Sequence, residues 1–297
     1  MKKRVLVLLL CGALLCGCGS RLGKYQRINF ESDYRNELLD CIRDDTVVTN
    51  NTNETFPTQL PIYKIKERII SEETAQEMCR NLGFEGSCFS RYKEDGNYLD
   101  ISLTSYTNVD RGYFEMTEEE GEALAWELFR KIPFMEGEYE CAGIGHTITI
   151  SDHEGSHITR AGFLFHRALD GVRVTGAVEC MLYLDGSGLV GVSIRLYDYE
   201  KIGTMDLVSL QDASSRLKTP DDFDFERSGF EPSGMIGELR YDQVKLLLVN
   251  QHHEGCKILQ PIYYYTGTAT LGDGKTEGFS SKIIAIPDTY TYETEAE

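Results

Sequence analysis

Apolar residues recur at helical spacing in three stretches of the chain. These stretches are 71–82, 117–132 and 209–219. Each begins at Ser or Thr, carries acidic residues in its first turn and stops at Gly or Pro, which are the usual signals of helix boundaries. The pattern therefore predicts three helices. It also gives the acidic first turns a structural role, because they favour the positive end of the helix dipole.

Between these stretches, apolar and polar residues alternate in short segments joined by Gly-containing turns. The clearest case is 179–184, the turn 185–188 and 189–196, where every even-numbered residue from 190 to 196 is apolar. Alternation with a period of two predicts strands, and the glycines of the turn supply the positive φ angles that a hairpin needs. Residues 243–250 fit a strand or a helix.

A helix followed by an antiparallel β-meander, repeated along the chain, predicts an α+β fold. The first α+β domain is predicted at 58–206 and holds two helix-plus-meander units. A C-terminal α+β unit follows at 207–289, and 290–297 form an acidic tail. Residues 18–57 are polar and lack an apolar period, which predicts a flexible tether.

The start of the chain has the layout of an export signal. Residues 2–4 are basic, and the uncharged run 5–15 is too short to span ~30 Å of hydrocarbon comfortably. Leu15-Cys16-Gly17-Cys18 resembles the bacterial lipobox, in which the chain is cut before a Cys that is then lipidated; a Cys at the second position is a mild departure. This predicts a signal peptide at 1–17 and lipidation of Cys18. A plain secretory signal is the alternative.

The net charge of the chain limits the classes of partner that it can bind. Apolar residues make up 41 % of it, enough for a core, and its net charge is −18. Removal of residues 1–17 takes away three positive charges and leaves −21. Such a surface repels nucleic-acid phosphates and anionic headgroups, which argues against nucleic-acid binding. Lipid, with acyl chains of the palmitate kind, is the predicted anchor at the extracytoplasmic face of the cell membrane.

Six cysteines follow the predicted lipidation site. They are Cys41, Cys79, Cys88, Cys141, Cys180 and Cys256. Outside the cytosol they could pair as disulfides, with Cys79 and Cys88 closest in sequence, or remain as buried thiols. The sequence does not determine the pairing. No Cys-x-x-Cys pattern of a zinc site occurs.

One motif could carry chemistry. His153, Glu154 and His157 match His-Glu-x-x-His, which on a helix places both imidazoles on one face for zinc and supplies Glu as the base. The strand-like run 147–150 comes immediately before it, however, and Gly155 disfavours a helix. We therefore predict the tip of a β-hairpin, no cofactor and no catalytic residue. A zinc metallopeptidase that uses these three residues is the alternative.

Four segments carry a resemblance to a known family. They are 165–174, 181–190, 261–265 and 279–286. Together they resemble the PepSY-like modules of Gram-positive envelopes, which occur in peptidase propeptides and in YycH/YycI-type regulators beside sensor kinases. The resemblance covers roughly 117–287. It implies a non-catalytic module that binds or restrains another envelope protein, and it transfers no catalytic residue.

The predicted function is therefore that of a membrane-anchored, extracytoplasmic lipoprotein, not an enzyme, which binds another cell-envelope protein. Tyr197 and Tyr199 follow the regular strand at 189–196, on its outward, odd-numbered side, and are the predicted partner-binding residues. A ligand-binding lipoprotein of a transporter is a further alternative. The sequence names neither the partner nor the oligomeric state.

Overall fold

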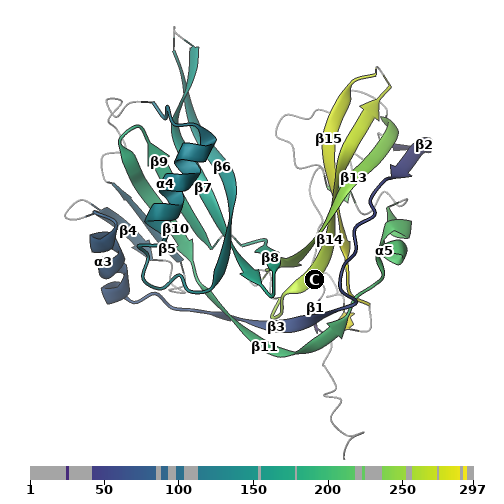
Figure 1. Cartoon of the computed structure of the whole chain (residues 1–297), viewed down its shortest axis with the longest axis horizontal. Helices are drawn as coiled ribbons and strands as arrows, with labels where there is room; N and C mark the ends of the chain where they lie inside the picture. Colours follow the sequence, from purple (N-terminus) through teal and green to yellow (C-terminus); the bar gives the residue numbers. More distant parts are fainter. Residues whose placement is uncertain are drawn as a thin grey trace, which may run out of the picture.

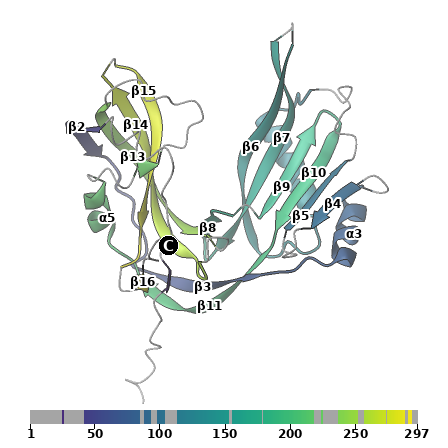
Figure 2. The same cartoon turned by 180° about the vertical axis from the view of Figure 1, so that it is seen from behind.

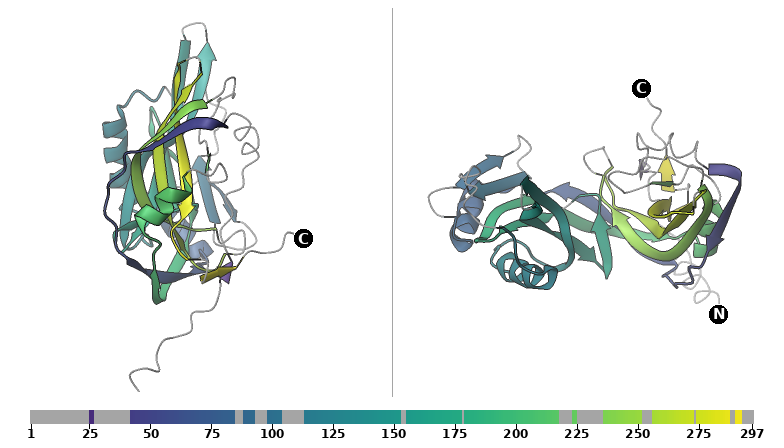
Figure 3. Two further views of the ribbon diagram at one scale, coloured as in Figure 1. Left: turned by 90° about the vertical axis from the view of Figure 1, so that its right-hand side faces the viewer. Right: turned by 90° about the horizontal axis from the view of Figure 1, so that it is seen from above.

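The chain forms two lobes that stand side by side and are joined at their base (Figure 1). The same arrangement is seen from behind and from above (Figures 2 and 3). The computed structural model describes residues 25–26, 42–84, 88–92, 98–103, 113–152, 155–177, 179–217, 223–224, 236–251, 256–272, 274–287 and 290–292.

The first lobe is an antiparallel sheet covered by two helices. In spatial order its strands are β6 (Glu138–Asp152), β7 (Gly155–Leu169), β9 (Cys180–Asp185), β10 (Gly188–Arg195), β5 (Tyr98–Leu103) and β4 (Cys88–Tyr92). The helices α3 (Glu72–Asn81) and α4 (Glu118–Phe129) share one hydrophobic core with alternate residues of β7, β9 and β10. The period of two along these strands therefore marks the face on which the helices pack.

All three predicted helices are confirmed, together with their capping residues. Ser71 caps α3 and Thr117 caps α4, where the Thr117 hydroxyl and the Glu120 carboxylate form a reciprocal capping box. The third helix, α5 (Leu210–Arg216), begins after Ser209, whose hydroxyl accepts a hydrogen bond from the backbone N–H of Asp212. These contacts are made within four residues, which is why the sequence alone predicted them.

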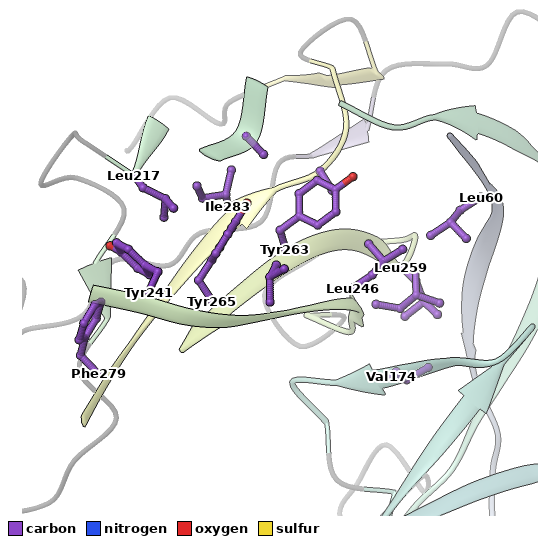
Figure 4. Packing of buried hydrophobic residues seen from close by; sticks show 14 of the residues in the cluster. Leu60, Val174, Leu217, Tyr241, Leu246, Leu259, Tyr263, Tyr265, Phe279 and Ile283 are labelled. Atoms are coloured by element: carbon purple, nitrogen blue, oxygen red, sulfur yellow. The ribbon is translucent and has the colours of Figure 1, made fainter. Parts of the chain in front are cut away.

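The second lobe is a meander of long strands with α5 against it. Its strands are β2 (Ile42–Asn50), β13 (Ile236–Val249), β14 (Gln260–Leu271), β15 (Thr276–Ile284) and β12 (Phe223–Asp224). Tyr241, Tyr263 and Tyr265 are at most 2 % exposed and pack with Leu217 and Ile283 in its core (Figure 4). The strand β2 runs parallel to β13, whereas the other neighbours are antiparallel.

Two features join the lobes at their base. A two-stranded antiparallel ribbon of β3 (Gln59–Glu67) and β11 (Tyr197–Asp206) runs between them (Figure 1). The short strand β8 (Val172–Thr175) pairs antiparallel with β7 and parallel with β13, so one hydrogen-bonded sheet passes through both lobes. A further parallel pair joins β1 (Tyr25–Gln26) to β16 (Thr291–Tyr292).

The predicted fold class is wrong. The described chain is mostly β, with mixed and antiparallel sheets, and is not a repeat of helix plus meander. The reason is that α3 and α4 do not each cover a sheet of their own. They pack on a single sheet, and that sheet takes β9 and β10 from the sequence between α4 and α5.

The predicted tether is also wrong over part of its length. Residues 42–50 form β2, where the Thr46 hydroxyl donates to the carbonyl oxygen of Ile236 at 2.8 Å and Val48 packs against the second-lobe core. Phe56 lies with its ring centroid 5.5 Å from that of Tyr263. The domain boundaries at 206/207 and 289/290 stay predictions.

Candidate functional site

The hairpin formed by β6 and β7 extends beyond its neighbours (Figures 1 and 2). Residues 161–165 of β7 pair with β9, but residues 155–160 pair with β6 alone among the named strands. We call 145–152 together with 155–160 the distal arm. Every residue from 145 to 151 is exposed. The arm is therefore a two-stranded ribbon that stands in solvent while its base is held by the lobe core.

Large apolar side chains are concentrated on the distal arm. Ile148 and Ile150 on β6 are 38 % and 42 % exposed, and Ile158 on β7 is 38 % exposed. Ile148 and Ile150 share one face of the ribbon, whereas Ile158 pairs with Thr149 and shares the opposite face. Clustered exposed apolar residues mark interaction sites, whereas single ones on a surface need no explanation.

The two edges of the distal arm differ. The β7 edge is covered, because the backbone N–H of Phe114 donates to the carbonyl oxygen of Ile158 at 2.8 Å and the Tyr113 ring stacks on His157 with centroids 4.3 Å apart. The β6 edge has no strand beyond it within the described chain. The arm thus presents exposed isoleucines beside an open strand edge.

At the base of the hairpin, a buried carboxylate connects the lobes. Glu179 is 1 % exposed, and its oxygens accept hydrogen bonds from the hydroxyls of Tyr199 at 2.6 Å and Tyr139 at 3.0 Å. The Tyr199 hydroxyl accepts from the amide of Asn250 at 3.2 Å, and Arg167 donates to the Tyr139 hydroxyl at 3.1 Å. Because these residues come from the hairpin, from β11 and from the end of β13, the network ties the arm to the ribbon and to the second lobe.

Burial is the main cause of the pKa shifts in this network. Desolvation raises the pKa of the Glu179 carboxyl, although the two tyrosine hydrogen bonds and Arg167 oppose the rise. Burial and then the Glu179 charge raise the pKa of Tyr199 well above its usual value. The phenol therefore stays neutral and acts as a donor. The network therefore has a structural role, which is to hold the hairpin, the ribbon and the second lobe together. It presents no nucleophile.

We expect the stability difference between Glu179→Gln and the wild type to depend on pH. The carboxyl titrates near 4.5 in the unfolded chain and at a higher pH in the folded chain. As the pH rises from 4.5 through the raised folded pKa, the wild type therefore loses stability relative to the variant, by at most about 1.4 kcal/mol per pH unit. Urea unfolding of both proteins at several pH values measures this loss, and a constant difference would contradict it.

The outward orientation predicted for Tyr197 and Tyr199 is wrong. Tyr197 is 7 % exposed in the second-lobe core, and the hydroxyl of Tyr199 is bound to Glu179. The alternation up to residue 196 is confirmed, since its even-numbered residues are at most 4 % exposed. It does not continue because the chain leaves β10 there and enters β11, whose partner is β3. A role of the two tyrosines in partner binding stays untested.

The His-Glu-x-x-His match lies at a hairpin, as predicted. His157 lies in β7 opposite Ile150, and Asp152 pairs with Gly155 across the turn. A zinc peptidase needs both imidazoles on one helical face, whereas His157 lies in a strand, so the structure gives the metallopeptidase alternative no support and that alternative stays untested. His153 and Glu154 lie outside the described residues, as does Cys18. Within the described part of the chain, no group of three His, Cys, Asp or Glu residues could hold a metal ion.

The described cysteine side chains carry thiols rather than disulfides. They are Cys79, Cys141, Cys180 and Cys256. The nearest pair in sequence, Cys79 with Cys88, is therefore not formed. Burial raises the pKa of the Cys180 thiol, which is 0 % exposed, and that of Cys141. Raised thiol pKa values make these two groups poor nucleophiles. Cys41 and the Cys88 side chain lie outside the described part.

Sequence reasoning missed both the Glu179 network and the distal arm. The sequence places Glu179 only in a strand, and nothing near it in sequence marks its partners Tyr139 and Tyr199. The arm did leave a signal. The run Thr147-Ile148-Thr149-Ile150 precedes a turn, and its apolar residues lie far from any segment predicted to cover them.

Comparisons with known proteins give a weak similarity to a solved structure. No family model and no curated protein match the chain. Among solved structures, YycH from Bacillus subtilis aligns with a TM-score of 0.38 and 10 % identity, over 72 % of this chain and 52 % of that one. The chain thus spans about half the length of that structure, and no residue correspondence is drawn from it. Within the described residues, no helix has both the length and the apolar character that crossing a membrane requires.

Proposed function

We propose that this chain is a non-catalytic protein of the extracytoplasmic face of the cell membrane, tethered through lipid on Cys18. In this proposal it binds or restrains another envelope protein, of the sensor or peptidase-regulator type, through the distal arm. The observation that carries the proposal is the exposure of Ile148, Ile150 and Ile158 together on one projecting hairpin.

The arm is suited to protein recognition because it is rigid at its base. Phe163 and Phe165 of β7 are 0 % exposed, so the strand that forms half of the arm is anchored in the first-lobe core. A surface held in one conformation loses little entropy when a partner docks. Burial of the three isoleucines then contributes about 25 cal/mol per Å² of apolar area removed from water.

The lipid tether is supported by Leu15-Cys16-Gly17-Cys18 and by the charge of the chain. A net charge of −18 before processing disfavours adsorption on anionic headgroups, which favours a covalent acyl anchor over a basic surface patch. The transporter alternative calls for doubly wound βαβ lobes. The sheet of the first lobe is antiparallel, and β13, β14 and β15 of the second lobe also pair antiparallel, so this alternative gains no support.

The tether predicts the behaviour of a single variant. Cys18→Ala should abolish incorporation of labelled palmitate and leave an uncleaved precursor. Detergent partition and mass spectrometry of the purified protein measure both effects. Cys16→Ala is the matched control, because it restores the usual residue of the motif and should be processed normally. Normal processing of Cys18→Ala would contradict the tether.

Partner binding is tested in intact cells with a photo-crosslinking amino acid. Placed at Ile150, it should give a discrete adduct with one envelope protein. Placed at Ile69, which is 73 % exposed but lies off the arm, it should not. Equal adducts from both positions, or none from either, would contradict binding through the arm.

A further inference from the structure

We propose that the arm's partner is an extended, basic segment of another protein, which adds as a strand to the open edge of β6. This rests on the proposed function and identifies the chemistry of the partner. It assigns the recognition to the backbone of residues 145–152, with side chains as secondary contacts. Strand addition of this kind obtains affinity from main-chain hydrogen bonds and specificity from alternate side chains.

The open edge is the first step of the argument. Among the named strands, β6 pairs only with β7, along the whole stretch from Glu138 to Asp152. The opposite edge of the arm is blocked by the Phe114 N–H bond to Ile158. A peptide can therefore extend the ribbon at β6 but not at β7 without first displacing residues 113–114.

The second step is that this edge lacks the usual protection against pairing. Exposed edges are generally blunted by Lys, Pro or β-bulges. The extra residues that bulge β6 lie between Cys141 and His146, close to the base, where Gly143 has a φ of +78°. One further register shift lies within the arm, between Ile148 and Thr149, and its extra residue, Thr159, is on β7. Residues 145–151 contain no Lys, Arg, Pro, Asp or Glu. The distal half of β6 is thus an unguarded template for another strand.

The third step concerns the side chains that a new strand would meet. The run Thr147-Ile148-Thr149-Ile150 consists of β-branched residues, which fit a pleated surface. Ile148 and Ile150 lie on one face and the threonines on the other. A partner strand with apolar residues at alternate positions would place them beside the two isoleucines and its polar residues beside the threonines.

Charge decides between a second copy of this chain and a different partner. Two copies, each carrying −18 before processing and −21 after it, repel one another. A basic segment is instead attracted by the same surface. The occupant is therefore a basic strand from another protein.

The proposal is tested with the full chain in detergent and a synthetic probe of about nine residues, the length of an ordinary strand. The probe alternates valine and threonine and is flanked by lysines. It should bind, as measured by fluorescence anisotropy, and should slow amide hydrogen exchange over residues 145–152. A version N-methylated at every valine and threonine has no backbone N–H group to donate on either edge and should bind at least about tenfold more weakly. A glutamate-flanked version should also bind more weakly, with a gap that narrows in high salt.

Two protein variants form the matched pair. Ile150→Lys places a charge on the open edge and should weaken binding of the lysine-flanked probe about tenfold. Ile69→Lys makes the same change at an exposed position off the arm and should leave binding within about twofold. Circular dichroism checks that both variants are folded.

Each other outcome overturns the proposal. Equal binding of the N-methylated probe excludes strand addition, and so does equal weakening by the two variants. Sedimentation that shows a dimer of the wild type and a monomer of Ile150→Lys would make a second copy the occupant. In any of these cases a crosslink at position 150 to an envelope protein still supports the proposed function, whereas its absence contradicts that function separately.

Discussion

Phe165→Ala is expected to lower the free energy of unfolding by about 3–5 kcal/mol. The Phe165 side chain is 0 % exposed at the centre of the first-lobe core. Its ring stacks on that of Phe129 with centroids 4.3 Å apart and meets Trp126 edge-on at 4.9 Å. Truncation removes both aromatic contacts and leaves a cavity that α4 cannot fill without leaving the sheet. Urea unfolding followed by circular dichroism measures the loss.

Ile69→Ala serves as the control for this variant, since Ile69 is 73 % exposed and should change stability by less than about 0.5 kcal/mol. A loss of under about 1 kcal/mol in Phe165→Ala would mean that the helices do not pack on this sheet as described. The result also bears on function, because Phe165 holds the strand that carries half of the distal arm.

Gly267→Ala is expected to destabilise the second lobe by about 1–3 kcal/mol. Gly267 pairs with Tyr241 on one side and with Phe279 on the other, and the rings of those two residues meet with centroids 4.8 Å apart. An added Cβ would lie 2.9 Å from the Cα of Tyr241 and closer still to the backbone carbonyl of Arg240. Backbone atoms within a long strand ladder cannot yield as a side chain can.

The matched control lies on the neighbouring strand. Gly278→Ala makes the same change in β15, where the nearest atom to the added Cβ is 4.0 Å away. This substitution should be neutral or slightly stabilising, because it also reduces the entropy of the unfolded chain. Thermal unfolding of both variants gives the comparison, and equal melting temperatures would contradict the close approach of β13 and β14.

Phe165→Ala and Gly267→Ala probe separate hydrophobic cores. This separation determines how a partner that binds the distal arm would affect the second lobe. The first-lobe and second-lobe clusters have no residue in common. Contact between the lobes depends on β8, on the β3–β11 ribbon and on the Glu179 network. A partner that strains the arm would therefore act on the second lobe through a few hydrogen-bonded groups rather than through a shared apolar core.

Only part of the candidate site could be predicted from sequence. The turn after Asp152 and the β-branched run before it were sufficient to predict a hairpin in place of a zinc-binding helix. Whether Ile150 is buried or exposed depends on which strands pair beside it. The local sequence pattern does not indicate this pairing. Burial of Glu179 likewise depends on Tyr139, Tyr199 and Asn250, which lie between 20 and 71 residues away in sequence.

Short-range chemistry explains what the sequence specified correctly. The caps of the three helices, the turn between β9 and β10, where Gly188 has a positive φ angle, and the buried alternation up to residue 196 all arise from contacts within a few residues. The export segment is also a local pattern, and it stays a prediction. These features are encoded where they occur, because the groups that stabilise them are neighbours in the chain.

Which distant segments pair with one another could be determined only from the tertiary structure. Residues 42–50 have no apolar period, yet they form β2 because β13 offers them a parallel edge. Tyr197 continues an alternating strand in sequence, yet it is buried because β11 leaves that sheet to pair with β3. An edge is available only after the other strands have taken their places. The burial of such residues is therefore a property of the assembled sheet and not of their own sequence neighbourhood.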